Sequence, residues 1–207
     1  PSAVSDYDID NSLRFENADS PYLIRTPGSG GNQKTFTLSF WTKRADLGVK
    51  QAVFSAGSAG GSGTAADNLW TVNFTTADKI NFWGPNDASA ASYMDLSSTR
   101  LFRDVGAWYH IVITIDTTES LEADRAKMYV NGVQETLVGG NKPDEDSSTY
   151  VNSTIPHQVG MYGKDADAWY SSYLAEFYFI DGTAYDADDF GELSSTTNQW
   201  KPIDASD

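Results

Sequence analysis

One stretch decides the fold class: Trp108-Tyr109-His110-Ile111-Val112-Ile113-Thr114-Ile115. It is β-branched and apolar at both odd and even positions, which is typical of a central strand covered on both faces. Nearer the N-terminus, Phe36, Leu38 and Phe40 alternate with polar residues. Because successive side chains of a strand point to opposite faces, this spacing predicts a strand with one buried face.

The same period of two recurs along the chain. It predicts further strands at residues 12–15, 22–24, 51–55, 69–74, 79–83, 126–130, 158–161 and 173–180. Asn131-Gly132 predicts a two-residue hairpin, because both central residues of a type I′ turn need positive φ. Only residues 186–190 predict a helical turn, capped by Asp186 and stopped by Gly191. About eleven short strands and one helical turn indicate an all-β, antiparallel two-sheet sandwich in a single domain.

The composition excludes several functional classes. The 207 residues carry a formal net charge of -15, and of the 29 acidic residues only seven are Glu. This charge argues against nucleic acid and anionic membrane surfaces as partners, because like charges repel; solubility in a salty medium is the simpler interpretation of the acidity. The chain has no Cys, which excludes a disulfide scaffold and a Cys nucleophile. No apolar stretch approaches the roughly 20 residues that span a bilayer.

Several short motifs occur in an order that resembles a known family. A "W-Y-H" strand, matched by residues 107–114, precedes a "Y-V-N-G" hairpin, matched by residues 128–133. Further matches are residues 11–15, 20–23, 36–43, 52–55, 159–160 and 173–177. In this order they resemble laminin G-like, concanavalin A-like jelly rolls. The resemblance covers residues 11 to 190 and implies that jelly-roll fold.

The C-terminal end resembles a narrower subgroup. Residues 174–184, 189–192 and 200–202, together with residues 10–15 and 22–27, look like virion proteins of marine bacteriophages. The resemblance implies a virion surface location, with capsid or tail proteins as partners. A homotrimer is expected from that setting and from no residue pattern. We expect residues 1–10 to form an arm or linker, residues 11–193 the jelly-roll domain and residues 194–207 a C-terminal tail.

Enzymatic chemistry is not expected. Glycoside hydrolysis needs two carboxylates facing one sugar ring, and the jelly-roll glucanases carry them in a pattern resembling E-x-D-x-x-E. The nearest match, Glu122-Ala123-Asp124, has Lys127 where the second Glu would stand. His110 is interpreted as a packed strand histidine, and His157 has no nearby Ser elbow.

Calcium is the expected cofactor, if the chain has one. A hard cation takes six to eight oxygens, typically from Asp, Asn and carbonyl groups in loops. The candidate ligands are Asp165, Asp167, Asp19 and Glu176, and the resemblance implies such sites in rim loops. The alternative is that these are solvated acids in turns.

Sugar binding uses exposed aromatic rings that stack on pyranose faces beside Asp or Asn acceptors. The candidate residues are Trp83 with Asn86, and Trp169 with Tyr170; Tyr93 and Tyr150 also lie outside the periodic strands. The alternative is that these rings cover the end of the sandwich.

The sequence leaves three functions open. The first is a non-enzymatic virion surface module (decoration, knob or fibre component) that contacts host glycans. The second is a purely structural virion protein with no external ligand. The third is a polysaccharide depolymerase. The first two are supported almost equally, because a fold does not fix a function.

Overall fold

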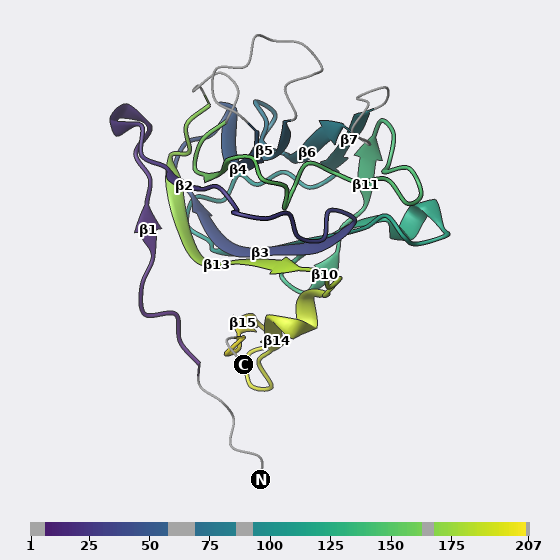
Figure 1. Ribbon diagram of the computed structural model, residues 1–207. Helices are drawn as coiled ribbons and strands as arrows, with labels where there is room; N and C mark the ends of the chain where they lie inside the picture. Colours follow the sequence, from purple (N-terminus) through teal and green to yellow (C-terminus); the bar gives the residue numbers. More distant parts are fainter. Residues whose placement is uncertain (1–6, 58–68, 86–92, 163–167, 206–207) are drawn as a thin grey trace.

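The computed structural model describes residues 7–57, 69–85, 93–162 and 168–205. Two large sheets stack face to face, and all their strand pairs are antiparallel (Figure 1). The predicted all-β antiparallel sandwich is therefore confirmed. No helix in the described part of the chain is long and apolar enough to cross a membrane.

The first sheet has six strands in the order β1-β13-β3-β8-β9-β10. Its strands are β1 (Leu13–Arg14), β3 (Thr35–Arg44), β8 (Tyr109–Asp116), β9 (Ala126–Val130), β10 (Val133–Gln134) and β13 (Ser172–Asp181). The deciding stretch forms β8, between β3 and β9, as its double-sided apolar pattern predicts. Asn131 and Gly132 join β9 to β10 with φ values of 49° and 80°, which confirms the predicted hairpin.

The second sheet has seven strands in the order β11-β7-β6-β5-β4-β12-β2. Its strands are β2 (Leu23–Arg25), β4 (Gln51–Ala56), β5 (Trp70–Phe74), β6 (Ile80–Pro85), β7 (Tyr93–Ser98), β11 (Leu137–Gly139) and β12 (His157–Val159). The apolar alternation did not predict β7 and β11. Asp95 and the serines of β7 weaken its apolar pattern, and β11 has only three residues.

The core fills the space between the two sheets. Phe36, Leu38 and Phe40 of β3 are fully buried, as their alternation predicts. They face the seven-stranded sheet, where Trp70 meets the Phe36 ring edge-on at a centroid distance of 5.5 Å. Large aromatic side chains bury much apolar area each, so this layer contributes to the stability of the sandwich.

A buried ion pair closes one end of the core. Arg44 is 1% exposed and lies over the Phe74 ring, with Cζ 4.0 Å from the centroid. Its guanidinium donates to two backbone carbonyls and lies 3.6 Å from Asp78 Oδ1. Asp78 also accepts from the Gly48 amide and from Arg103. The network ties three loops to the end of β3.

The outer face of the six-stranded sheet is covered by the C-terminal end. The helical turn η4 (Ala187–Asp189) begins with a capping box from Asp186, as predicted. It is followed by a hairpin of β14 (Gly191–Leu193) and β15 (Trp200–Pro202). The hairpin therefore crosses the boundary expected at residue 193. Two further short turns, η1 (Asn17–Asp19) and η3 (Glu122–Asp124), were not predicted.

Trp200 fastens this hairpin to the sheet through His110. The indole N–H donates to His110 Nδ1 at 3.0 Å, and the two rings are stacked. Since the indole nitrogen is only a donor, His110 carries its proton on Nε2, which lies 2.9 Å from Ser39 Oγ. A Cβ at Gly132 or Gly191 would lie 2.3 Å or 2.6 Å from the indole, so both glycines leave room for the ring.

The N-terminal segment runs along the β1 edge of the six-stranded sheet (Figure 1). Tyr7 donates its hydroxyl to Glu176 Oε1 at 3.1 Å, and Tyr178 donates to Glu176 Oε2. The region expected as an arm or linker therefore contacts the sheet from residue 7 onward. Both ends of the described chain pack on the six-stranded sheet.

Candidate functional site

The outer face of the seven-stranded sheet carries polar and aromatic side chains at its centre. In β5, Trp70, Val72 and Phe74 fill the core, so Thr71 and Asn73 point to the other face. In β6, the core residues Ile80 and Phe82 alternate with Asn81 and Trp83 in the same way; β7 adds Tyr93, Asp95 and Ser97.

Strand register aligns these residues in two rows. Thr71 pairs with Trp83, and Trp83 pairs with Asp95. One row further along, Asn73 pairs with Asn81, and Asn81 pairs with Ser97. The Asn81 Nδ2 group lies 2.7 Å from Asp95 Oδ1 and 3.1 Å from Ser97 Oγ. Asn81 therefore fixes the carboxylate of Asp95 beside the indole row.

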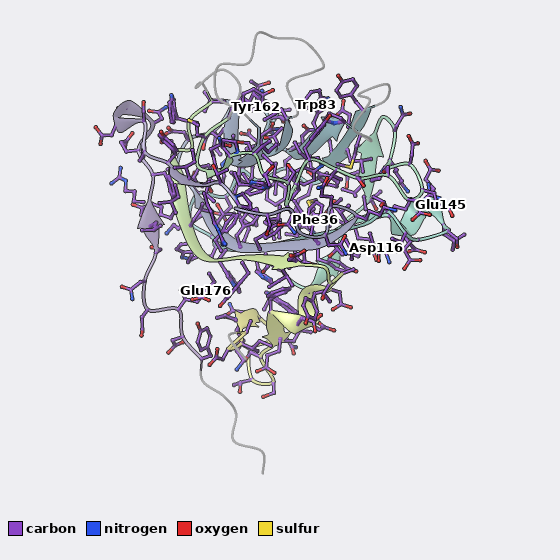
Figure 2. The ribbon with its side chains drawn as sticks, in the orientation of Figure 1. Phe36, Trp83, Asp116, Glu145, Tyr162 and Glu176 are labelled. Carbon is purple, nitrogen blue, oxygen red and sulfur yellow. The ribbon has the colours of Figure 1, made fainter. Side chains whose placement is uncertain are left out.

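Trp83 is held in place by aromatic and apolar neighbours. Its ring stacks on Tyr93, with a centroid distance of 5.1 Å and an interplanar angle of 13°. It also packs against a small cluster formed by Ala52, Leu69 and Tyr162. Trp83 stays half-buried, so part of the indole faces solvent. Figure 2 shows Trp83 and Tyr162 on the same side of the sandwich, beyond the seven-stranded sheet.

A cavity of about 360 Å³ lies on this face. It is lined by Lys50, Thr71, Asn73, Thr75, Thr76, Asn81, Trp83, Asp95 and Tyr162. Lys50 lies over the Tyr162 ring, with Nζ 3.8 Å from the centroid. The cavity thus combines an aromatic wall with amide, hydroxyl, carboxylate and ammonium groups.

This arrangement is suited to binding. Hydroxyl-rich molecules offer C–H faces to aromatic rings and O–H groups to amides and carboxylates, and this cavity presents both kinds of partner. Among the described residues that line it, Asp95 is the one carboxylate, whereas glycoside hydrolysis uses two. We call the nine residues that line this cavity the Trp83 face.

The structure places the four predicted sugar-binding residues differently. Trp83 lies in the cavity. Trp169 packs on Tyr22 at a centroid distance of 5.8 Å and does not line the cavity. Tyr170 is fully buried, bonded to Thr42 and stacked on Phe74, so the prediction that it contacts sugar is wrong. Asn86 lies outside the described residues.

The predicted calcium ligands do not assemble in the described part of the chain. Asp19 is exposed in η1, and Glu176 accepts the hydroxyls of Tyr7 and Tyr178 on β13. Figure 2 places Glu176 on the opposite side of the sandwich from Trp83. Asp165 and Asp167 lie outside the described residues. No group of three or more His, Asp or Glu side chains placed to hold a metal occurs within the described ranges. Within the described ranges, Asp19 and Glu176 are therefore not part of such a group.

Sequence reasoning missed most of the Trp83 face. The residues it missed are Lys50, Thr71, Asn73, Thr75, Thr76, Asn81, Asp95 and Tyr162. The alternation in residues 69–74 and 79–83 contains the signal for three of them: Thr71, Asn73 and Asn81 occupy the positions opposite the core. Lys50 and Tyr162 come from segments distant in sequence, and no local pattern connects them.

Comparison with known proteins identifies the family. A family profile described as the concanavalin A-like lectin/glucanases superfamily matches residues 17–183. The chain belongs to this superfamily. The laminin G-like, concanavalin A-like jelly roll expected from the motifs is thus confirmed. A search of curated proteins finds no match.

Solved structures with the concanavalin A-like fold include binding domains. The chain resembles domains LG4-5 of the mouse laminin alpha1 chain at 11% identity, covering 96% of this chain and 46% of that one, with a TM-score of 0.59. It resembles the Ruminococcus gnavus IT-sialidase CBM40 bound to alpha2,3 sialyllactose at 12% identity, covering 82% and 95%, with a TM-score of 0.51. It also resembles a mutant NanB sialidase from Streptococcus pneumoniae at 14% identity, covering 88% and 28%, with a TM-score of 0.54.

These likenesses concern the fold. At such identities, residues of the superfamily members do not transfer to positions in this chain. The chain spans less than half of the laminin fragment and 28% of the sialidase. Any binding function of this superfamily member must therefore be argued from its own residues.

Proposed function

We propose that this chain is a non-enzymatic carbohydrate-binding module that holds its glycan on the Trp83 face. The observation that carries the proposal is the half-buried Trp83 ring, fixed by Tyr93 and set beside Asp95 and Asn81. A sugar ring can stack on the indole while its hydroxyls bond to the amide and the carboxylate. These groups are held by neighbouring residues before a ligand arrives, which lowers the entropy lost on binding.

The nature of the cavity suggests which sugars to test first. Lys50 is the one cationic side chain that lines it among the described residues, so a sugar carboxylate would find a counter-ion there. One structural neighbour is described as bound to sialyllactose, and another is a botulinum neurotoxin binding domain. Sialylated and other acidic glycans are therefore the first set to test, with neutral glycans beside them.

Replacing Trp83 with Ala tests the proposal. On a glycan array, we expect the unmodified chain to bind a defined set of glycans. Trp83→Ala should weaken that binding at least about tenfold, since an aromatic stack contributes about 1.5 kcal/mol or more including its buried area. Isothermal titration calorimetry with the best glycan from the array measures the change.

Trp108→Ala is the matched control. Trp108 is 37% exposed and precedes β8 of the other sheet, so its loss should leave glycan affinity unchanged. Equal weakening by both substitutions would contradict the assignment to the Trp83 face. A blank array from a folded chain, or release of reducing ends from polysaccharide, would contradict the function itself.

We further propose that this module works on the surface of a bacteriophage particle, as a decoration, knob or fibre component. The support is the resemblance of residues 174–184 and 200–202 to marine phage virion proteins. In that setting capsid or tail proteins are its partners, and a homotrimer is its proposed assembly. A density map of the particle with this chain located in it tests the proposal; absence of the chain from purified particles would contradict it.

Calcium binding stays a proposal that rests on Asp165 and Asp167. Calorimetry with Ca²⁺ on a sample first treated with EDTA measures it, and we expect a binding heat and a higher melting temperature. Glu176→Gln is the control, because both Glu176 oxygens accept tyrosine hydroxyls and its loss should leave the heat unchanged. A sample with neither heat nor shift would contradict calcium binding.

A further inference from the structure

A second cavity, separate from the Trp83 face, opens between the two sheets at the side where β13 faces β2 and β12. Its volume is about 530 Å³, within the range of roughly 300–1,000 Å³ typical of small-molecule sites. Its apolar lining is provided by Leu23, Ile24, Phe54, Val159, Phe177 and Phe179. The cavity shares no residue with the Trp83 face.

A β-bulge in β13 aims two aromatic rings into this space. Pairing with β3 shifts between Ala175 and Tyr178, and Glu176 has a φ of 46°. Leu174 faces the core before the bulge, and Phe177 and Phe179 face it afterwards. The core-facing positions of β13 therefore change from even-numbered to odd-numbered residues at the bulge. Both Phe rings stack on Phe54, at centroid distances of 6.2 Å and 6.4 Å, yet both stay half-buried because the cavity exposes them.

The apolar surface continues beyond this cavity. A neighbouring cavity of about 430 Å³ shares Leu23, Val159 and Phe177 with it and adds Leu13, Phe15 and Leu174. Leu13 and Leu23 are 54% and 52% exposed, although both belong to strands. Because they share three lining residues, the two cavities adjoin, and we call them together the side groove. Two adjoining cavities with a shared apolar wall are suited to a ligand with a long apolar chain.

Arg25 is a cationic side chain that lines the side groove and forms no ion pair with the described residues. Along β2, Leu23 and Arg25 point to one face of the strand and Ile24 to the other. Arg25 pairs with His157 and Leu23 pairs with Val159, and both partners on β12 also line the groove. Within the described ranges, the Arg25 guanidinium forms no ion pair. An exposed guanidinium offers two parallel donors to a carboxylate.

Three other polar side chains in the lining of the side groove form hydrogen bonds to neighbouring residues. The His157 ring donates from Nδ1 to the Ile155 carbonyl and accepts a hydrogen bond at Nε2 from the backbone N–H of Asn152. Burial lowers the pKa of His157, which keeps the ring neutral at pH 7. Asp181 accepts the Asn32 amide, and Glu176, in the neighbouring cavity, accepts two tyrosine hydroxyls. A hydrogen bond does not neutralise a carboxylate, so Arg25 is the one cationic side chain beside two acidic ones in the described lining of the side groove, and it is the group there that can pair with a carboxylate.

We propose that the side groove binds a fatty carboxylate, with its acyl chain along Phe54, Phe177 and Leu23 and its carboxylate on Arg25. Two independent observations support this occupant: the apolar wall that the two adjoining cavities share, and Arg25, the one cationic side chain in their described lining. The acyl chain gains apolar contact area, and the charge-assisted hydrogen bonds fix its direction. This inference does not depend on glycan binding at the Trp83 face.

The experiment is calorimetry of the full chain with sodium decanoate below its micelle concentration, and with the neutral alcohol decanol. We expect decanoate to bind. Arg25→Gln should weaken decanoate binding about tenfold or more and leave decanol binding unchanged, because only the acid meets the guanidinium. Leu23→Trp, which fills the groove from an exposed position, should weaken both ligands.

Arg14→Gln is the matched control. Arg14 is an exposed arginine of β1, the edge strand of the other sheet, and it pairs with Glu16 instead of lining the groove. It should bind decanoate as the unmodified chain does. Circular dichroism confirms that each variant is folded. The proposal is overturned by no decanoate binding, by equal binding in Arg25→Gln, or by self-association that buries Leu23 and leaves no decanoate heat.

Discussion

Replacing Asp78 with Ala is expected to lower the free energy of unfolding by about 3–5 kcal/mol. Asp78 is 4% exposed, and its carboxylate neutralises Arg44, which is 1% exposed. The substitution would leave a guanidinium charge buried against Phe74 with no acidic partner among the described residues. Removing one member of a buried pair costs more than the pair itself contributes, because the remaining charge stays desolvated. Urea denaturation at pH 7 measures the loss.

A double-mutant cycle with Arg44→Met tests the cause of that loss. Methionine fills similar apolar space beside Phe74 and carries no charge. In the Arg44→Met background, Asp78→Ala should cost much less than in the unmodified chain. Equal costs in both backgrounds would show that Asp78 acts through Gly48 and Arg103 alone, and would contradict the role given to the buried pair.

Acid is expected to destabilise the chain through His110 by about 3 kcal/mol between pH 7 and pH 4. Burial lowers the pKa of His110 from 6.5 to about 4. Below pH 6.5 the His110 side chain is protonated in the unfolded chain but stays neutral in the folded chain. The contribution of His110 to the free energy of unfolding is therefore fully present above pH 6.5 and is lost as the pH falls toward 4. A proton on Nδ1 would also displace the Trp200 indole N–H.

His110→Gln separates this contribution from the other titrating groups. Gln can accept and donate hydrogen bonds but does not titrate in this range. Protonation of Asp78 also destabilises the folded chain in acid, because the pKa of Asp78 is lower than its ordinary value. Burial raises that pKa, but the Gly48 amide, Arg103 and Arg44 lower it by more. Since Asp78 and His157 titrate in both proteins, the difference in pH dependence reports His110. Identical pH profiles would contradict the prediction.

Much of the fold could be predicted because β-strand side chains alternate strictly. The period of two in residues 35–41 and the double-sided pattern of residues 108–115 both follow from which faces are buried. The bulge at Glu176 could not be predicted, since both parities of residues 173–180 are apolar and an unbroken strand fits them equally well. The inward rings of Phe177 and Phe179, and with them the side groove, depend on that irregularity.

The candidate site was predicted less completely, for a physical reason. Trp83 could be found because an aromatic residue entering a polar turn is visible locally. Tyr170 has the same local setting after Asp165 and Asp167, but packing between Phe15 and Phe74 buries it. Lys50 meets Tyr162 only through tertiary contact. Exposure and long-range pairing are properties of the folded chain, and no short motif contains them.

The packing of both chain ends on one sheet gives the molecule a direction. Tyr7 is bonded to Glu176, which lies on the opposite side of the sandwich from Trp83 (Figure 2). Ala205 packs in the cluster around Phe190, on the outer face of the same six-stranded sheet. An anchor joined at either end would hold the molecule with its cavity turned outward. Immobilisation through the ends, on a sensor chip or on a larger assembly, would therefore display the Trp83 side to the solution.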